Sequence, residues 1–320
     1  MKKYDVVALG ELLIDFTENG KSEQGNPLFE ANPGGAPCNL LAMLSKLGNS
    51  TAFVGKVGND SFGKQLKNTL EEVGIDATHL YMDEEVHTTL ALVHTLADGD
   101  REFSFYRNPG ADMMLTEEEI PEELIQNSKI FHFGTLSMTH EGVRRATKKA
   151  LDIAKKAGCI ISFDPNLRPP LWDSLETAKE QVLYGLAYCD VLKISDNEIQ
   201  WLTGEEDYTD GVNWILERFQ IPLILVSMGK EGSRAYYKGS MVEVAPFLQK
   251  NTIETTGAGD TFGGCVLHYI CQKGLENLTK ENLEEMLRFA NAAAALITTR
   301  KGALRVMPSQ DEIARVLESN

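Results

Sequence analysis

Positive charge is scarce in this chain. Its 320 residues include 31 Lys and Arg against 47 Asp and Glu, so the formal net charge is −16 at pH 7. Nucleic acids and anionic membrane surfaces are themselves negatively charged and do not attract a strongly acidic protein. We therefore expect neither a nucleic acid nor a membrane among its partners.

Cysteines and long apolar runs are also few. The five cysteines are scattered and never spaced as Cys-x-x-Cys, which favours reduced thiols over disulfides. No apolar run is long enough to cross a bilayer, and the first residues lead straight into a strand pattern without a signal-peptide core. We expect a cytoplasmic protein.

The two best-known phosphate-binding signatures are missing. The one Gly-Lys-Ser sequence, at residues 20–22, has Asp15 where a Walker A loop needs its first glycine. The spacing Gly257-x-Gly259-x-x-x-Gly263 is one residue too long for the dinucleotide fingerprint. Neither a P-loop fold nor a Rossmann dehydrogenase is indicated.

Short apolar segments alternate with helical patterns along most of the chain. We expect buried strands at residues 6–10, 51–57, 130–134, 160–164, 191–194 and 223–227, with helices between them. A hairpin of residues 233–237 and 241–244 and two long helices are expected after the last of these strands. This alternation predicts an α/β fold with a mostly parallel sheet covered by helices on both faces. With 42% hydrophobic residues and no clear linker, residues 1–320 are expected to form one domain.

Two segments do not fit the alternation of strands and helices. Residues 14–30 and 88–106 alternate as strands do, but they are polar and interrupted by glycine. We interpret them as strands of a small sheet that projects from the core as a lid. Long surface loops are the alternative interpretation.

The most informative stretch is residues 253–264, Ile-Glu-Thr-Thr-Gly-Ala-Gly-Asp-Thr-Phe-Gly-Gly. Apolar residues with helical spacing follow it, so Gly257 and Gly259 lie at a helix start. The first N–H groups of a helix lack internal partners and attract anions, and glycine lets a phosphate approach closely. Asp260 would then lie beside the anion as a base, which suggests phosphoryl transfer to an alcohol. An Asp in a first turn can also be no more than a favourable charge.

A second glycine-rich segment, residues 32–39, precedes another apolar helix. Gly34 and Gly35 permit close backbone approach, and Asn39 offers both a donor and an acceptor at the helix start. This arrangement suits the hydroxyls of a neutral sugar, although a glycine turn with an Asn cap has the same pattern. Further polar segments follow several strands, so we expect one cleft at the carboxyl ends of the sheet.

These two motifs, in this order, resemble the two signatures of the ribokinase-like (PfkB) carbohydrate kinases, and the resemblance covers essentially the whole chain. Residues 10–15, 105–112 and 163–168 look most like the fructokinase branch of that family. The 2-keto-3-deoxygluconate kinases share much of the pattern. The resemblance implies the ribokinase-like three-layer fold and an ATP-dependent sugar kinase that uses Mg²⁺.

The resemblance also implies roles for individual residues. Asp260 matches the catalytic base, and Gly257, Ala258 and Gly259 match the anion hole. Six residues match contacts to the sugar: Asp15, Gly34, Gly35, Asn39, Arg107 and Arg168. On the nucleotide side, the matching residues are Ser195, Ser227, Gly229, Gly232 and Asn291, with Glu198 holding Mg²⁺ through water.

Among the positions that depart from the family pattern, two are candidate site residues. Ser195 stands where the family motif has Asn, which puts the metal and water network there in doubt. The family also has a potassium site, for which Glu254, Thr256, Arg300 and Gly302 are the candidates here. Glu254 replaces the usual Asp of that site, and its extra methylene puts potassium activation in doubt.

The expected substrate is an unphosphorylated sugar. Family members that act on sugar phosphates often carry Lys after the two glycines, whereas Ala36 and Pro37 stand here. Fructose is the first choice, and 2-keto-3-deoxygluconate is the alternative because Arg107 and Arg168 could bind its carboxylate. A non-catalytic sugar- or nucleotide-binding regulator is a further alternative, which the presence of Asp260 opposes. In this family, lids like the one expected from residues 14–30 and 88–106 often pair two subunits, so the resemblance also implies a homodimer.

Overall fold

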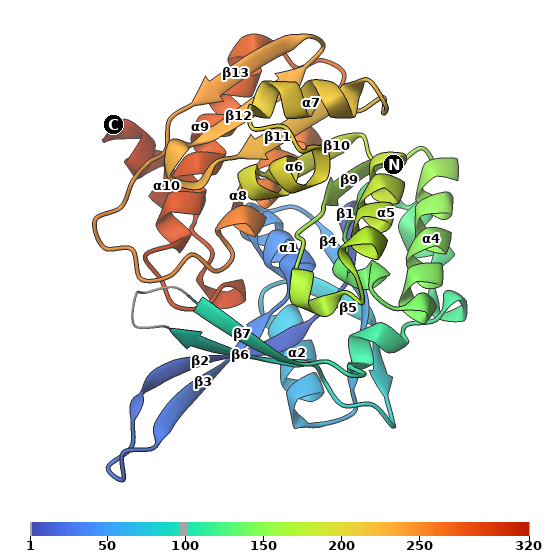
Figure 1. Ribbon diagram of the computed structural model, residues 1–320, viewed down its shortest axis with the longest axis vertical. Helices are drawn as coiled ribbons and strands as arrows, with labels where there is room; N and C mark the ends of the chain where they lie inside the picture. The colour runs from blue at the N-terminus through green and yellow to red at the C-terminus, as the bar shows by residue number, and fades with distance from the viewer. Residues whose placement is uncertain (1, 96–100, 320) are drawn as a thin grey trace.

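The computed structural model describes residues 2–95 and 101–319, and its strands form two sheets (Figure 1). The large sheet has nine strands in the order β13-β12-β11-β10-β9-β8-β1-β4-β5. Strands β5 to β11 in that order run parallel, and β12 and β13 are antiparallel. The bounds of its strands are β1 Tyr4–Leu9, β4 Thr51–Gly58, β5 Ile75–Asp83, β8 Ser128–Gly134, β9 Ile160–Asp164, β10 Val191–Ser195, β11 Leu223–Ser227, β12 Ser233–Tyr237 and β13 Ser240–Val244.

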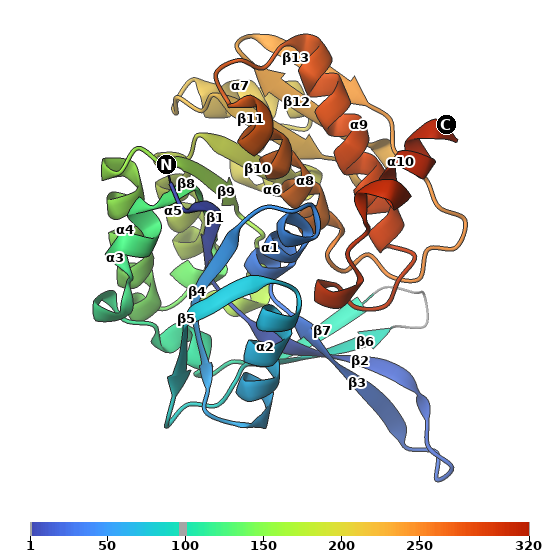
Figure 2. The same cartoon turned by 180° about the vertical axis from the view of Figure 1, so that it is seen from behind.

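Helices cover both faces of the large sheet because its strands are apolar on both sides. In β1, Val6 and Ala8 face one core cluster and Val7 and Leu9 face the other. The first cluster includes residues of α1 Ala36–Lys46, α2 Ser61–Glu72, α8 Ala258–Lys273, α9 Lys280–Ile297 and α10 Gln310–Glu318. The second includes residues of α3 Glu122–Gln126, α4 Glu141–Lys156, α5 Leu175–Leu186, α6 Asp196–Thr203 and α7 Tyr208–Leu216. Figures 1 and 2 show the resulting three layers, which confirm the predicted fold class.

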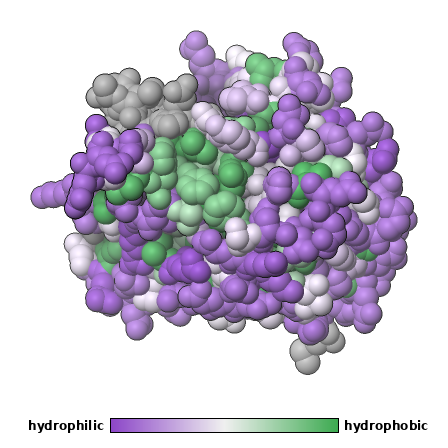
Figure 3. Space-filling view, turned by 90° about the horizontal axis from the view of Figure 1, so that it is seen from below, coloured by the Kyte–Doolittle hydropathy of each residue, from purple (hydrophilic) through white to green (hydrophobic). Residues whose placement is uncertain are grey.

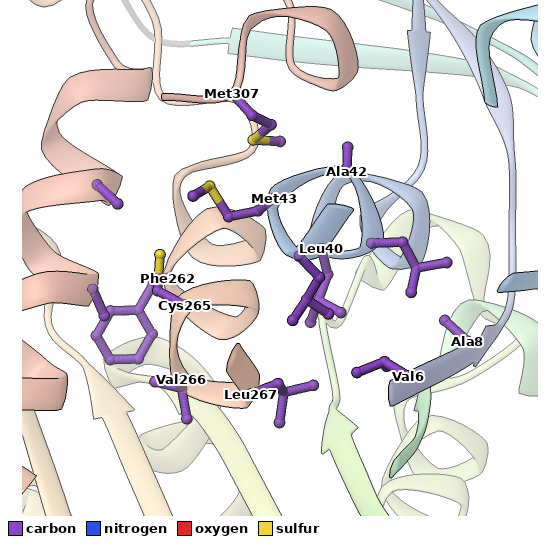
Figure 4. Packing of buried hydrophobic residues seen from close by; sticks show 14 of the residues in the cluster. Val6, Ala8, Leu40, Ala42, Met43, Phe262, Cys265, Val266, Leu267 and Met307 are labelled. Carbon is purple, nitrogen blue, oxygen red and sulfur yellow. The ribbon is translucent and has the colours of Figure 1, made fainter. Parts of the chain in front are cut away.

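The helices that follow the two glycine-rich motifs pack directly on each other. In Figure 4, Leu40 and Met43 of α1 face the apolar residues of α8. A side chain at Gly264 would have its Cβ 2.8 Å from Met43 Cβ, so glycine is needed for this close approach. The packing brings the starts of α1 and α8 together, although they are far apart in the sequence.

The small sheet contains the two segments that did not fit the alternation. Its strands are β2 Leu13–Lys21, β3 Pro27–Gly34, β6 Leu90–Thr95 and β7 Arg101–Tyr106, in the order β3-β2-β6-β7. The sheet projects from the body of the molecule (Figure 2). The predicted small projecting sheet is confirmed for the described residues; residues 96–100 of the second segment lie outside them.

The structure adds strand β5 and helices α3 and α10, which the sequence analysis missed, and it extends α1. Strand β5 forms an edge of the large sheet, where it pairs with β4. Because several of its residues are polar, it lacks the continuous apolar pattern of the other strands and was not predicted. Helix α1 begins at Ala36, three residues before the apolar pattern, because Gly35 and Pro37 start it. In the described part of the chain, no helix combines the length and apolar character needed to span a membrane.

Candidate active site

A cavity of about 590 Å³ lies between the carboxyl ends of the central strands, the small sheet and the start of α8. Its size is in the range of small-molecule sites. The large sheet and the loops that follow its strands contribute Glu11, Gly35, Ala36, Asn39, Leu136, Asn166, Arg168 and Lys193. The small sheet contributes Leu13, Asp15, Thr17, Val93 and Phe105, and the α8 region contributes Thr252, Ile253, Glu254, Thr255, Thr256, Gly257, Gly259 and Asp260.

Asp260 lies in the first turn of α8 and faces the cavity. Gly257 begins the helix with a left-handed φ of 76°, which glycine adopts without strain. The side-chain amide of Asn39 donates a hydrogen bond to Asp260 Oδ2 at 2.8 Å. Desolvation raises the pKa of Asp260, while the Asn39 hydrogen bond and the positive charges of Lys193 and Arg168 act in the opposite direction.

The helix start has the polarity of an anion site. The Ala258 N–H donates to Thr255 O at 3.2 Å, and the N–H of Thr261 donates to Gly257 O at 2.8 Å. The backbone of Gly259, which lies between these two donors, lines the cavity. The structure therefore places Gly257 and Gly259 on the cavity wall, whereas the N–H of Ala258 already has a protein acceptor.

The sugar-side residues of the small sheet and α1 lie opposite α8. Any Cβ at Gly34 would overlap the Asp15 carboxylate, and a Cβ at Gly35 would lie 2.5 Å from Glu11 O. Gly35 also has φ of +132°, which disfavours other residues. Burial raises the pKa of Asp15 to about 7, opposed by the charge of Arg168 and aided by those of Glu254 and Asp260.

The two predicted arginines differ in their surroundings. Arg168 is exposed and lines the cavity. Arg107 is buried, and its guanidinium donates to Asp112 Oδ2, Thr139 Oγ1 and the Leu136 carbonyl at 2.7–2.9 Å. This geometry argues against direct contact between Arg107 and a sugar. Arg107 instead holds the Asp112, Thr139 and Leu136 segments together through buried hydrogen bonds and an ion pair.

The predicted nucleotide-side residues lie along the same sheet edge, outside the cavity. Ser195 and Ser227 are neighbours in the register of β10 and β11. Ser195 caps α6, and Glu198 Oε2 accepts from its N–H at 2.9 Å and from its hydroxyl at 2.7 Å. Glu198 Oε1 accepts from the Leu167 N–H at 2.7 Å. Both carboxylate oxygens thus have protein donors, which fits contact with Mg²⁺ through water better than direct ligation.

The remaining nucleotide-side residues shape the loop after β11 and the neighbouring strands. Gly229 and Gly232 have φ of 52° and 102°, and a Cβ at Gly232 would overlap Val244 O. The Asn291 amide donates to Val244 O and Ala245 O at 3.2 Å and accepts from the Ser233 hydroxyl at 2.9 Å. Its polar atoms are therefore used in joining α9 to β12 and β13.

Two of the four candidate potassium residues, Glu254 and Gly302, are in contact near the start of α8, and Glu254 and Thr256 also line the cavity. Glu254 Oε1 accepts from the Gly302 N–H at 2.9 Å, so the two segments touch. The Arg300 guanidinium donates to Val306 O and to Glu312. Because a guanidinium has no acceptor atom, Arg300 could contact a cation only through its backbone carbonyl oxygen. The arrangement is compatible with a monovalent cation held by oxygen atoms. Among the described residues, no group of three or more His, Cys, Asp or Glu side chains could hold a metal ion by itself.

Two charged residues that line the cavity, Glu11 and Lys193, had no role in the predicted site. Glu11 follows β1, and its Oε1 accepts from the Ala36 N–H at 2.9 Å; burial raises its pKa to about 7. Lys193 lies inside the apolar strand β10, and its Nζ is 2.9 Å from Asp164 Oδ2. Glu11 could have been found as a carboxylate directly after a strand, and Lys193 as a charge interrupting an apolar run.

Comparison with known proteins defines the class to which this fold and cavity belong. The model of the pfkB family carbohydrate kinases matches residues 3–310, and the chain belongs to this family. Probable fructokinase-4 of Arabidopsis thaliana is 41% identical, with 98% of this chain and 97% of the relative covered.

Solved structures agree with this assignment. Fructokinase from Xylella fastidiosa with bound ATP has a TM-score of 0.90 and 30% identity, covering 100% of this chain and 99% of the other. A double mutant of fructokinase from Vibrio cholerae O395, bound to fructose, ADP and a potassium ion, has a TM-score of 0.88 and 30% identity, with 99% of each chain covered.

Proposed function

We propose that this protein is an ATP-dependent fructokinase that converts fructose and ATP into fructose 6-phosphate and ADP. The observation that carries the proposal is the position of Asp260, at the start of α8, on the wall of a cavity and in contact with Asn39. Relatives named fructokinase match nearly the full length, and the Vibrio cholerae relative binds fructose and ADP.

The surroundings of Arg107 favour fructose over 2-keto-3-deoxygluconate. A sugar acid needs a cation for its carboxylate. The three groups around Arg107 already use its guanidinium, so of the two arginines expected for this role Arg168 alone faces the cavity. The cavity wall also carries the carboxyl groups of Glu11, Asp15, Glu254 and Asp260. Carboxylates accept hydrogen bonds from hydroxyls and repel another carboxylate, so a neutral sugar suits this wall better.

In the proposed mechanism, Asp15 and Asn39 bind sugar hydroxyls and hold one of them beside Asp260. Ionised Asp260 accepts the proton of that hydroxyl as its oxygen attacks the γ-phosphorus of ATP, and the bond to the ADP oxygen breaks. The positive end of α8 and the backbone of Gly257 and Gly259 attract the phosphoryl oxygens. When bound, Mg²⁺ neutralises charge on the nucleotide phosphates, and Glu198 would hold it through water.

The small sheet is the proposed lid of this site. Leu13, Val93 and Phe105 line the cavity from its strands, so the sheet can cover a bound sugar and exclude water. Figure 3, which views the molecule from the side of this sheet, shows apolar side chains gathered in one area of the surface. Tyr106 and Leu28 of the sheet are 63% and 47% exposed. Pairing of two copies through the lid, the single-domain division, potassium activation and a cytoplasmic location stay predictions.

A panel of sugars tests the proposed substrate. The purified protein is supplied with ATP and Mg²⁺, and ADP release is measured with fructose, other hexoses, ribose and 2-keto-3-deoxygluconate. Fructose should give the highest kcat/KM, and phosphorus NMR should identify the 6-phosphate. Preference for 2-keto-3-deoxygluconate would make the alternative correct, and no sugar-dependent release would favour a non-catalytic binding protein.

A further inference from the structure

Lys193 is a charged residue inside an otherwise buried strand. Its neighbours Leu192 and Ile194 have no exposed surface, whereas the Lys193 side chain is 13% exposed and lines the cavity. Its Nζ lies 2.9 Å from Asp164 Oδ2, on the adjacent strand β9. The ion pair therefore fixes an ammonium group at the carboxyl end of the sheet, where it faces the cavity.

The same ammonium group reaches the start of α8. A Cβ added at Gly259 would lie 3.1 Å from Lys193 Nζ and 3.6 Å from its Cε. Burial alone would lower the pKa of Lys193, but the charges of Asp164, Glu198 and Asp260 raise it above its ordinary value, so the group stays protonated. Lys193 thus adds a full positive charge where the helix dipole supplies a partial one.

A purely structural role for Lys193, joining β10 to β9 through Asp164, does not account for its position on the cavity wall. Buried ion pairs are often no more stabilising than apolar residues of similar volume. Within the described part of the chain, Asp164 is the one ionic partner of Nζ, and an ammonium has three N–H donors. The chain also lacks a Walker A lysine and a lysine after Gly35. Arg168, the other cation on the cavity wall, is exposed and acts on Asp15 at the sugar side as well as on Asp260.

We propose that Lys193 is a further catalytic residue, whose ammonium donates a hydrogen bond to an oxygen of the γ-phosphoryl group during its transfer. Asp164 positions the ammonium, and Gly259 leaves space for it against the helix start. Lys193 keeps its proton throughout, and no bond to it forms or breaks. This inference rests on the proposed kinase function and adds a side-chain cation to the backbone anion site.

Binding of two nucleotides distinguishes this role from a structural one. Affinities of Mg²⁺ complexes of ADP and of a non-hydrolysable β,γ-imido ATP analogue are measured by calorimetry for the wild type and Lys193→Met. A charge-assisted hydrogen bond contributes about 1.5–3 kcal/mol, so Lys193→Met should lower the affinity for the analogue about ten- to hundredfold. Affinity for ADP, which lacks the γ-phosphate, should stay the same. Unchanged affinity for the analogue, or equal losses for both nucleotides, would overturn the proposal.

Lys56→Met is the matched control. Lys56 is also a lysine with little exposure, 9%. Its Nζ lies 2.7 Å from Glu119 Oε1 and 3.7 Å from Asp83 Oδ2, and it is outside the set of described residues that line the cavity. This variant should bind both nucleotides as the wild type does. If Lys193→Met does not fold, Lys193→Arg keeps the charge but moves its donors, and a selective loss of analogue affinity is again expected, with equal losses overturning the assignment. A wild type that binds neither nucleotide would instead overturn the proposed function.

Discussion

Asn39 and Asp260 are joined by a 2.8 Å hydrogen bond between helices α1 and α8, with Asn39 Nδ2 as donor and Asp260 Oδ2 as acceptor. The bond links the two glycine-rich motifs, 221 residues apart in the sequence. Asn39 is 4% exposed, and its Oδ1 has no hydrogen-bond partner among the described residues. A buried acceptor without a partner is costly, so this oxygen is well placed to accept a hydrogen bond from a sugar hydroxyl.

Asn39→Ala should impair both sugar binding and the base. It removes an acceptor for the sugar and a hydrogen bond that favours ionised Asp260. A hydrogen bond to a charged group contributes about 1.5–3 kcal/mol, so kcat/KM for fructose should fall about ten- to hundredfold. The KM for ATP should change little. Steady-state kinetics with each substrate varied would check this, and equal increases in both KM values would indicate a structural role.

Asp15 should make sugar affinity depend on pH near neutrality. Its folded-state pKa is about 7, above the usual value of 3.8, so it is protonated below that pH and ionised above it. Because the ionised form is the better acceptor for sugar hydroxyls, the Kd of fructose should fall as pH rises from 6 to 8, as a single group with this pKa predicts. Calorimetry at several pH values would measure this change. Asp15→Asn should weaken binding and remove most of the pH dependence, and a variant with the wild-type profile would assign the titration to another group.

The decrease of kcat/KM at acidic pH should reflect protonation of Asp260. Its pKa is raised, mainly by desolvation, so kcat/KM should fall with decreasing pH at values above the usual range of Asp. Lys193 lowers this pKa through its charge, and Lys193→Met should therefore move the acid limb to higher pH. Glu11, Asp15 and Asp164 also titrate in the cleft. The comparison of variants, with Lys56→Met as control, isolates the effect of Lys193, and coincident profiles would contradict it.

Arg107→Met should destabilise the fold rather than selectively weaken sugar binding. The substitution leaves the Asp112 carboxylate buried without its ionic partner. Breaking a buried pair on one side costs about 3–5 kcal/mol. Thermal and denaturant unfolding would measure the loss, and Arg107→Met combined with Asp112→Asn should recover part of it. A variant of normal stability with a selectively raised fructose KM would restore the predicted sugar contact.

The sequence predicted the fold well because its signals are local. The apolar runs of β9 and β11 and the glycines before α1 and α8 each determine structure within a few residues. The two motifs also predicted that Asn39 and Asp260 belong to one site, through their resemblance to a known family. The contact between these residues depends on how α1 packs against α8, which a single sequence does not encode locally.

What could not be predicted depends on the surroundings of charged side chains. Arg107 and Arg168 look equivalent in the sequence, but one is enclosed by Asp112 and Thr139 and the other is exposed at the cavity. Lys193 interrupts an apolar strand just before the Ser195–Glu198 segment, which marks it in the sequence but does not name its partner. Its significance arises from Asp164 on the next strand, which only the sheet register brings beside it.

The rate of phosphoryl transfer by Asp260→Asn tests the central claim most directly. The variant is nearly isosteric and keeps the start of α8, but its amide cannot accept the hydroxyl proton. With fructose, ATP and Mg²⁺ in saturating amounts, kcat should fall about 10²–10⁴-fold, as expected for loss of a general base. The unfolding temperature and the affinity for ADP should stay close to those of the wild type. A stable variant that binds ADP normally and keeps a kcat near the wild-type value would contradict the account.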